Sequence, residues 1–286
     1  MTEDSTFFID LRRKYGYFYL MRIFASSFPY IPRKSPFLYL TIFLFVFSLF
    51  AFYAESLFAA DFTISPVRVF IASGKKADVV TIKNNSDENL TVQISSFLWE
   101  QDAEAKDVLT PTEEVVLFPR IFTVKGREER ILRLGIKYPA TDVEKTYRIF
   151  IEEVPEPQEK QPEGAYLRTL MKVGVPVFVS PAKVKAEAIV DAKSLKNGIL
   201  SFSIKNNGNV HELVKTARVE GFDAKDNAVF TKDLAGWYVH RGKAKPFSTE
   251  IPKDVCASVK TIKIKIDTDR TAISDRMDVI PDMCAP

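Results

Sequence analysis

Histidine and cysteine are scarce in this chain, which contains two of each among 286 residues. His211 and His240 have no cysteine or further histidine at metal-ligand spacing, so we expect both in a turn or loop, exposed or hydrogen-bonded locally. The sequence also lacks a G-x-S-x-G motif, a P-loop and a dinucleotide-binding fingerprint. These absences argue against an enzyme, and we expect no cofactor and no metal.

A strong excess of one charge is also missing. The chain has 40 Lys and Arg residues against 37 Asp and Glu residues, a formal net charge of +3. Lysines and glutamates are interspersed, which is typical of a solvated surface. The composition therefore favours no nucleic-acid partner, and the missing motifs favour no small-molecule substrate.

Long helical periodicity is absent after residue 60, where short apolar runs alternate with turn residues. Such a pattern predicts β-strands. In the first half the predicted strands are residues 63–71, 78–83, 90–101, 115–118, 121–124, 129–136, 147–154 and 166–179. In the second half they are residues 183–190, 199–205, 213–222, 228–234, 247–251 and 258–268. The sequence therefore predicts an all-β fold.

An internal repeat divides this β-rich part in two. Ile-Lys-Asn-Asn occurs at residues 82–85 and again at 204–207, and a Ser-Pro pair precedes each copy. Matching order and context indicate two copies of one unit of about a hundred residues, the size of an immunoglobulin-like sandwich. We predict one such domain at residues 61–180 and a second at 181–286, with Pro181 at the boundary.

The N-terminal residues 1–60 differ from the rest. Arg33 and Lys34 precede an unbroken apolar run at residues 37–54, an order typical of an export signal. Small residues at Ala59 and Ala60 follow, although neither gives a regular cleavage site. Because the run is near the lower limit for a membrane-spanning helix, a cleaved signal peptide and a retained inner-membrane anchor both stay open. Met21 is an alternative start, and in every case the bulk of the chain is exported.

The two cysteines, Cys256 and Cys284, both lie near the C-terminus of the exported part. An oxidising compartment permits them to form one disulfide. On that ground a bridge is favoured over two free thiols.

The segment at residues 147–181 is the most informative. An apolar, β-branched run ends at Pro155, a charged loop follows, and a second apolar run reaches Ser180. Every second residue of that run lies on one face, which carries Leu167, Thr169, Met171, Val173 and Val175. Pro176 indicates an edge strand, because proline cannot donate to a neighbouring strand. An edge with an apolar stripe favours pairing with another chain.

Short motifs run through residues 61–181 in a fixed order. They include Ile-Ser-Pro-Val-Arg-Val-Phe at 64–70, Asn-Asn at 84–85, Trp-Glu-Gln at 99–101, Leu-Thr-Pro-Thr at 109–112, Phe-Pro-Arg-Ile-Phe at 118–122, Arg-Ile-Leu-Arg-Leu at 130–134 and Pro-Val-Phe-Val-Ser-Pro at 176–181. This series resembles the PapD-like family of periplasmic chaperones for pilus and fimbrial subunits, and its archaic branch in particular.

The resemblance implies two immunoglobulin-like domains, a periplasmic location, and pilus or fimbrial subunits and an outer-membrane usher as partners. It also implies donor-strand complementation, in which the chaperone's edge strand fills the groove of a subunit that lacks a strand. Leu167, Thr169, Met171, Val173 and Val175 would then contact the subunit. The alternative is that this stripe faces the domain's own core.

Family chaperones also hold a subunit's C-terminal carboxylate with two basic residues. Arg68 matches one of them, but the second position, a lysine in the best-known members, is Pro176 here. Lys172 and Arg148 are the candidate substitutes. A different class of function also stays open: a membrane-anchored, two-domain structural or adhesive module, with residues 37–54 as the anchor.

Overall fold

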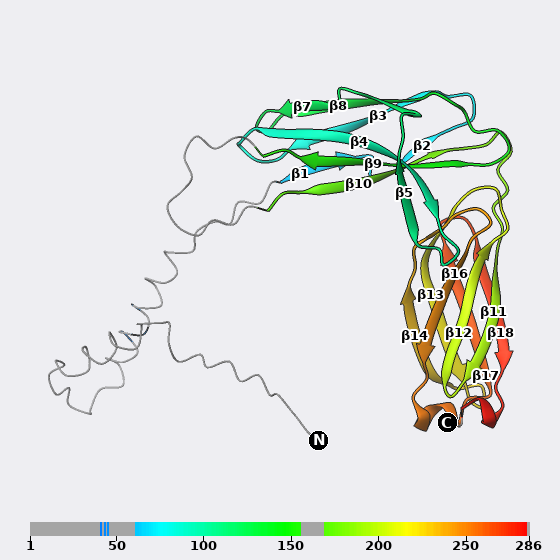
Figure 1. Cartoon of the computed structure of the whole chain (residues 1–286). Helices are drawn as coiled ribbons and strands as arrows, with labels where there is room; N and C mark the ends of the chain where they lie inside the picture. Colours follow the sequence, from blue (N-terminus) through cyan, green and yellow to red (C-terminus); the bar gives the residue numbers. More distant parts are fainter. Residues whose placement is uncertain (1–40, 42, 44, 46–60, 156–168, 285–286) are drawn as a thin grey trace, which may run out of the picture. The chain divides into compact units, whose positions relative to one another are not determined.

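The computed structural model describes residues 41, 43, 45, 61–155 and 169–284 (Figure 1). Apart from three helical positions, the predicted leader at residues 1–60 lies outside the described residues, and so does the export signal within it. Within the part of the chain that the structure describes, no helix is long and apolar enough to cross a membrane.

Two β-sheets form a first sandwich from residues 62–179. One sheet has the order β1-β3-β8-β6; the other has the order β2-β10-β9-β4-β5, with β7 paired to β4. The strands are β1 (Phe62–Ser65), β2 (Val69–Ile71), β3 (Ala77–Asn84), β4 (Leu90–Gln101), β5 (Asp107–Pro111), β6 (Val115–Phe118), β7 (Ile121–Val124), β8 (Glu129–Ile136), β9 (Lys145–Glu153) and β10 (Lys172–Val179).

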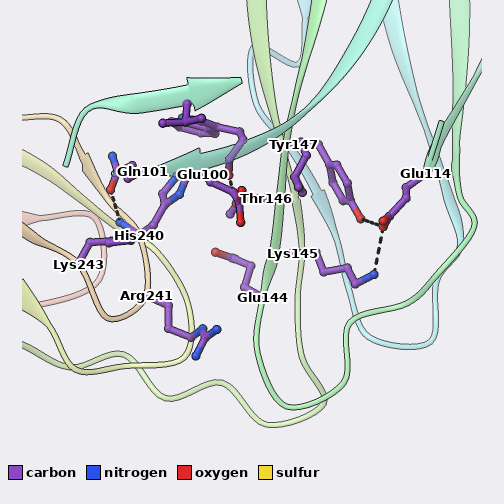
Figure 2. Close-up of a pocket in the computed structure, with 13 residues that line it drawn as sticks. Glu100, Gln101, Glu114, Glu144, Lys145, Thr146, Tyr147, His240, Arg241 and Lys243 are labelled. Atoms are coloured by element: carbon purple, nitrogen blue, oxygen red, sulfur yellow. Dashed lines mark hydrogen bonds and ion pairs between the residues drawn. The ribbon is translucent and has the colours of Figure 1, made fainter. Parts of the chain in front are cut away.

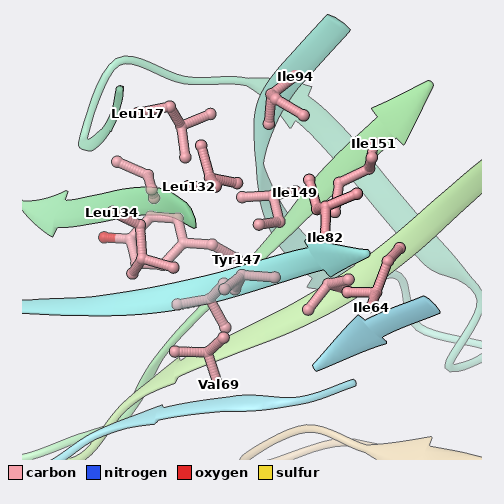
Figure 3. Close-up of a cluster of buried hydrophobic side chains, with 14 of the residues drawn as sticks. Ile64, Val69, Ile82, Ile94, Leu117, Leu132, Leu134, Tyr147, Ile149 and Ile151 are labelled. Carbon is pink, nitrogen blue, oxygen red and sulfur yellow. The ribbon is translucent and has the colours of Figure 1, made fainter. Parts of the chain in front are cut away.

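The core of the first sandwich comes from the alternating apolar residues of both sheets. Figure 3 shows aliphatic side chains such as Ile82, Leu132 and Ile149 gathered around Tyr147. The Tyr147 hydroxyl is 2.6 Å from a carboxylate oxygen of Glu114, to which it donates. Burial and this hydrogen bond raise the pKa of Tyr147, so the phenol stays neutral and its polar atom stays satisfied within the sandwich.

The first strand is divided between the two sheets. Residues 63–71 are predicted as one strand, but the structure breaks them at Pro66 into β1 and β2. β1 pairs with β3, whereas β2 runs parallel to β10 in the other sheet. Proline lacks a backbone donor, which explains why the ladder ends there. Arg68 therefore lies directly before β2.

The second sandwich uses residues 188–278. Its sheets have the orders β11-β12-β16 and β14-β13-β17-β18, with β15 paired to β13. The strands are β11 (Ala188–Lys196), β12 (Ile199–Asn206), β13 (Glu212–Phe222), β14 (Ala228–Ala235), β15 (Tyr238–Val239), β16 (Ala244–Glu250), β17 (Thr261–Thr268) and β18 (Ala272–Asp278). A short helix α3 (Lys253–Cys256) precedes β17, and a disulfide joins Cys256 to Cys284.

The predicted all-β fold with two sandwiches is confirmed. Besides the divided first strand, several predicted bounds are wrong: the strand predicted at 183–190 begins only at Ala188, the one predicted at 258–268 begins at Thr261, and β10 covers Lys172–Val179 rather than 166–179, of which 166–168 lie outside the described residues. The domain boundary at Pro181 stays a prediction, although the first sandwich's strands end at Val179 and the second's begin at Ala188.

The internal repeat places the same buried amide in both sandwiches. The Asn84 side chain donates to the carbonyls of Glu88 and Val124 and accepts from the backbone N–H of Ser86. Asn206 makes the matching set: it donates to Val210 and Val239 and accepts from Gly208. Both residues are buried, with exposed fractions of 1% for Asn84 and 0% for Asn206. Each amide thus ties the turn after its strand to a neighbouring segment.

Candidate functional site

Strand β10 has one open edge along most of its length. It pairs with β9 from Lys172 to Val179, but β2 covers its other side only at residues 177–179. Residues 172–176 therefore have a partner strand on one side alone among the described residues. Pro176 stands where the open part of the edge ends.

The predicted apolar stripe is distributed along this strand and the segment before it. Leu167 lies outside the described residues, Thr169 is exposed, and Met171 is half-buried. Val173 packs against the core from a half-buried position, and Val175 is in the core with 1% exposed. For Val175 the structure therefore shows the contact with the domain's own core that the alternative interpretation describes. A subunit-binding role for the stripe stays a prediction.

Met171 is fixed at the start of this edge by its backbone. Its carbonyl accepts a hydrogen bond from the backbone N–H of Glu153 at 2.9 Å, and its own N–H donates to the Glu153 carboxylate at 3.3 Å. The backbone of Met171 is thus tied to the end of β9 although it precedes β10. Its side chain remains partly accessible.

Arg148 lies directly across the sheet from Pro176. The two are register partners in the antiparallel β9–β10 pair. The guanidinium of Arg148 lies over the Trp99 ring, 3.8 Å from its centroid, and its Nη1 donates to Asp107 Oδ2 at 3.1 Å. Only 13% of the Arg148 side chain is exposed. A cation is therefore present beside the position at which the family's lysine is missing.

Asp107 is held by groups from both sandwiches. Besides Arg148, it accepts from Gln101 Nε2 at 3.2 Å and from the indole N–H of Trp237 at 3.1 Å. Burial raises the pKa of Asp107, but the interactions of the Trp99, Gln101 and Trp237 side chains and the charge of Arg148 together outweigh it. The net pKa lies below its usual value, so Asp107 is ionised at neutral pH.

The other two candidate cations differ from each other. Arg68 is half-buried and lies beside the hydroxyl of Tyr238: burial raises the pKa of Tyr238, and the charges of Arg68 and Arg148 oppose that rise. The charges of both arginines thus lower the pKa of the same hydroxyl group. Lys172 is half-exposed at the far end of β10 and forms an ion pair with Glu152 at 3.1 Å. Arg68 and Arg148 thus share an interaction with Tyr238, whereas Lys172 is paired with Glu152.

Aromatic rings fill the junction between the two sandwiches. Trp99 and Phe178 from the first sandwich form a buried cluster with Tyr238 from the second. The Gln101 side chain bridges the same junction, because its Nε2 donates to the carbonyl of Tyr238 and its Oε1 accepts from the backbone N–H of His240, each at 2.9 Å. These contacts fix β15 beside the end of β4.

Both histidines are buried at this junction, so the prediction that they are exposed or bonded locally is wrong. The His211 ring stacks on Phe178 with 3.6 Å between centroids, and its Nδ1 is 2.7 Å from Glu144 Oε2. The His240 ring makes a T-shaped contact with Trp99, and burial lowers the pKa of His240 to about 4. Their partners come from the other sandwich, and Glu144 is 67 residues from His211, so local sequence patterns gave no indication of them.

A pocket of about 580 Å³ opens beside this junction. Figure 2 shows Glu144, Thr146 and Lys145 on one side and His240, Arg241 and Lys243 on the other. Its lining mixes carboxylates, cations and apolar side chains. Among the residues that the structure describes, no group of three or more histidine, cysteine, aspartate or glutamate side chains could hold a metal ion.

Comparison with protein families decides the identity of the first sandwich. The sequence model of the pili and flagellar-assembly chaperone family, PapD N-terminal domain, matches residues 61–185. Residues 61–185 belong to the PapD N-terminal domain family. This confirms the resemblance to PapD-like chaperones that the motifs predict. A comparison with curated protein sequences gave no match.

Solved structures with this fold include several chaperones. The CsuC–CsuE chaperone–tip adhesion subunit pre-assembly complex, from archaic chaperone-usher Csu pili of Acinetobacter baumannii, matches with a TM-score of 0.53 at 19% identity, over 76% of this chain and 98% of that chain. The class 5 fimbriae chaperone CfaA matches with a TM-score of 0.52 at 16% identity, over 77% and 100% of the two chains. At such identities the match shows that the PapD-like domain and the second sandwich share the chaperones' fold.

Proposed function

We propose that this protein is a periplasmic chaperone that binds pilus or fimbrial subunits by donor-strand complementation and delivers them to an outer-membrane usher. The proposal is supported by the PapD N-terminal domain match and by the shared fold with pilus chaperones. One similar structure, from Salmonella enterica, holds the SafA pilin with the SafB chaperone, with a TM-score of 0.50 at 15% identity, over 78% of this chain and 99% of that chain. The proposed mode of binding uses β10.

The open edge of β10 suits the addition of a strand. An incoming strand would pair with the unpaired side of residues 172–176 and with the segment before them. Backbone hydrogen bonds would supply affinity, and side chains such as Met171 would enter the subunit's groove. Methionine suits this role because its flexible side chain adapts to irregular pockets.

The proposed carboxylate anchor includes the residue that pairs with Pro176 across the β9–β10 ladder. Arg148 lies opposite Pro176, at the end of the open edge, and Arg68 lies directly before β2, which closes that edge. A strand that ends there would place its terminal carboxylate beside two guanidinium groups. Arginine suits the role because its planar group can bind a carboxylate through two parallel hydrogen bonds. We propose Arg148 with Arg68, rather than Lys172, as the carboxylate anchor.

Copurification from periplasmic extract tests this function. Affinity-tagged wild-type protein should carry a small, β-rich secreted subunit, whereas Arg148→Ala should lose it. Truncating one partner of a desolvated charge pair costs about 2–5 kcal/mol, which weakens binding by a factor of about thirty or more. Lys172→Ala is the matched control. It removes a cation from the same sheet, and the side chain of Lys172 is 51% exposed.

Three outcomes separate the parts of the proposal. No subunit with wild-type protein would contradict the chaperone function. Equal subunit yields for wild-type protein and Arg148→Ala would contradict the anchor alone. Loss of subunit with Lys172→Ala but not with Arg148→Ala would move the anchor to Lys172. Retention of the usher's periplasmic domain by the copurified complex tests delivery.

A further inference from the structure

The anchor arginine already has a carboxylate partner from its own chain. Arg148 Nη1 donates to Asp107 Oδ2 at 3.1 Å, and the side chains are 13% and 20% exposed. Among the described residues, Asp107 is the only carboxylate that forms an ion pair with Arg148. A subunit's terminal carboxylate therefore meets a guanidinium that is not free.

Asp107 does not depend on Arg148 for its place. It stands at the start of β5, where its Cα is the register partner of Gln101. Gln101 donates to Oδ1, and the indole N–H of Trp237 donates to Oδ2. These two donors would keep the carboxylate in position while Arg148 turns part of its hydrogen bonding to a ligand. The negative charge thus remains beside an incoming carboxylate.

We propose that Asp107 is an internal counter-ion that competes with the ligand carboxylate for Arg148 and so favours release. This proposal rests on the anchor role of Arg148 proposed above. A buried guanidinium without a partner is strongly destabilising, and Asp107 supplies that partner whenever no ligand carboxylate is bound. The protein can then give up a carboxylate without leaving Arg148 unpaired.

The opposite assignment, in which Asp107 helps binding by orienting Arg148, is less well supported. The Arg148 guanidinium already lies over Trp99, which restricts its orientation without Asp107. The hydrogen bond to Asp107 uses one of the five guanidinium N–H groups of Arg148. The charge of Asp107 also lies close to the site, in an environment where repulsion between carboxylates is weakly screened. Repulsion should therefore exceed the benefit of added orientation.

The site carries its own optical reporter. The chain has two tryptophans, and Arg148 lies 3.8 Å from the ring centroid of Trp99 and 5.7 Å from that of Trp237. A change at Arg148 should alter tryptophan emission with no background from other tryptophans. This allows a minimal probe, acetate, to be titrated into the full exported chain, with acetamide and chloride at matched ionic strength as controls.

The experiment compares wild-type protein with Asp107→Asn, which keeps the size of the side chain and removes its charge. We expect Asp107→Asn to bind acetate about tenfold more tightly, which corresponds to about 1.4 kcal/mol. We also expect a lower melting temperature for the ligand-free variant, because Arg148 loses its counter-ion. Glu113→Gln, which breaks the exposed Glu113–Arg120 pair elsewhere on the first sandwich, should change neither acetate binding nor the site's emission.

Each result is decisive. Equal or weaker acetate binding by folded Asp107→Asn would overturn the counter-ion role while leaving the anchor intact. An acetate response that persists in Arg148→Ala would instead show that the anchor itself is misplaced, and would overturn both. If Asp107→Asn does not fold, Asp107→Ser is measured in its place. Tighter binding that also appears with Glu113→Gln would overturn the proposal, since a general charge effect would then explain it.

Discussion

The buried ring of His240 should make the stability of the protein depend on pH. Only 6% of this residue is exposed, and its buried Nε2 has no hydrogen-bond partner among the residues that the structure describes. Burial lowers its pKa to about 4, with smaller opposing and reinforcing effects from Asp107, His211, Arg148 and Lys243. In the unfolded chain the pKa should return to about 6.5.

The direction of the pH dependence of stability follows from these two pKa values of His240. Between about pH 6.5 and pH 4 the unfolded chain binds a proton at His240 that the folded protein excludes, so acid favours unfolding. The contribution of His240 to the free energy of unfolding is therefore present above its pKa in the unfolded chain. It is lost as the pH falls towards its pKa in the folded protein. Between about pH 7.5 and pH 4.5, this single group should lower the free energy of unfolding by roughly 2.5 kcal/mol.

Urea unfolding followed by tryptophan fluorescence checks this value, with His240→Phe as the comparison. Phenylalanine keeps a ring against Trp99 and cannot titrate, while the hydrogen bond to Gln101 uses the backbone N–H and survives. The two proteins should have similar stability near neutral pH. On acidification, wild type should lose about 2.5 kcal/mol more than the variant. Equal losses in both proteins would refute the burial argument.

Three further predictions concern the proposed binding edge and the second sandwich. Arg68→Ala should abolish subunit capture but leave the circular dichroism spectrum unchanged; wild-type yield of copurified subunit would exclude it from the anchor. Met171→Glu should stay folded and lose the subunit, because an unpaired charge cannot enter an apolar groove without a large desolvation cost; a collapsed melting temperature would favour the core interpretation, and a folded variant that binds normally would remove Met171 from the donor strand. Replacing Cys256 and Cys284 by serine should cost roughly 3–4 kcal/mol, because the disulfide closes a separation of 28 residues; two alkylated thiols in unreduced protein purified from the periplasm would show instead that the bridge does not form.

Long alternating strands were the most predictable part of the fold. The bounds predicted for β4 and β8 agree with the structure, because their apolar residues alternate over many positions. β5 and β18 were not predicted, since most of their residues are exposed or half-buried and few are apolar. The alternation carries no information where neither face of a strand is fully buried.

The candidate site was predictable only in part. The motif match identified Arg68, and position on β9 made Arg148 a candidate, but the choice of Arg148 over Lys172 needed the register with Pro176. Asp107 had no sequence signal at all, because its ion-pair partner is 41 residues away. Contacts of this kind arise only when β4, β5 and β9 meet in one sheet.

The bridge made by Gln101 has a consequence for the variation that this position can tolerate. The Gln101 amide donates one N–H to the carbonyl of Tyr238 and the other to Asp107, and its oxygen accepts from the backbone N–H of His240. Glutamate lacks the donors, lysine lacks the acceptor, and asparagine is one methylene shorter. Random mutagenesis under selection for folding should therefore recover glutamine here almost alone.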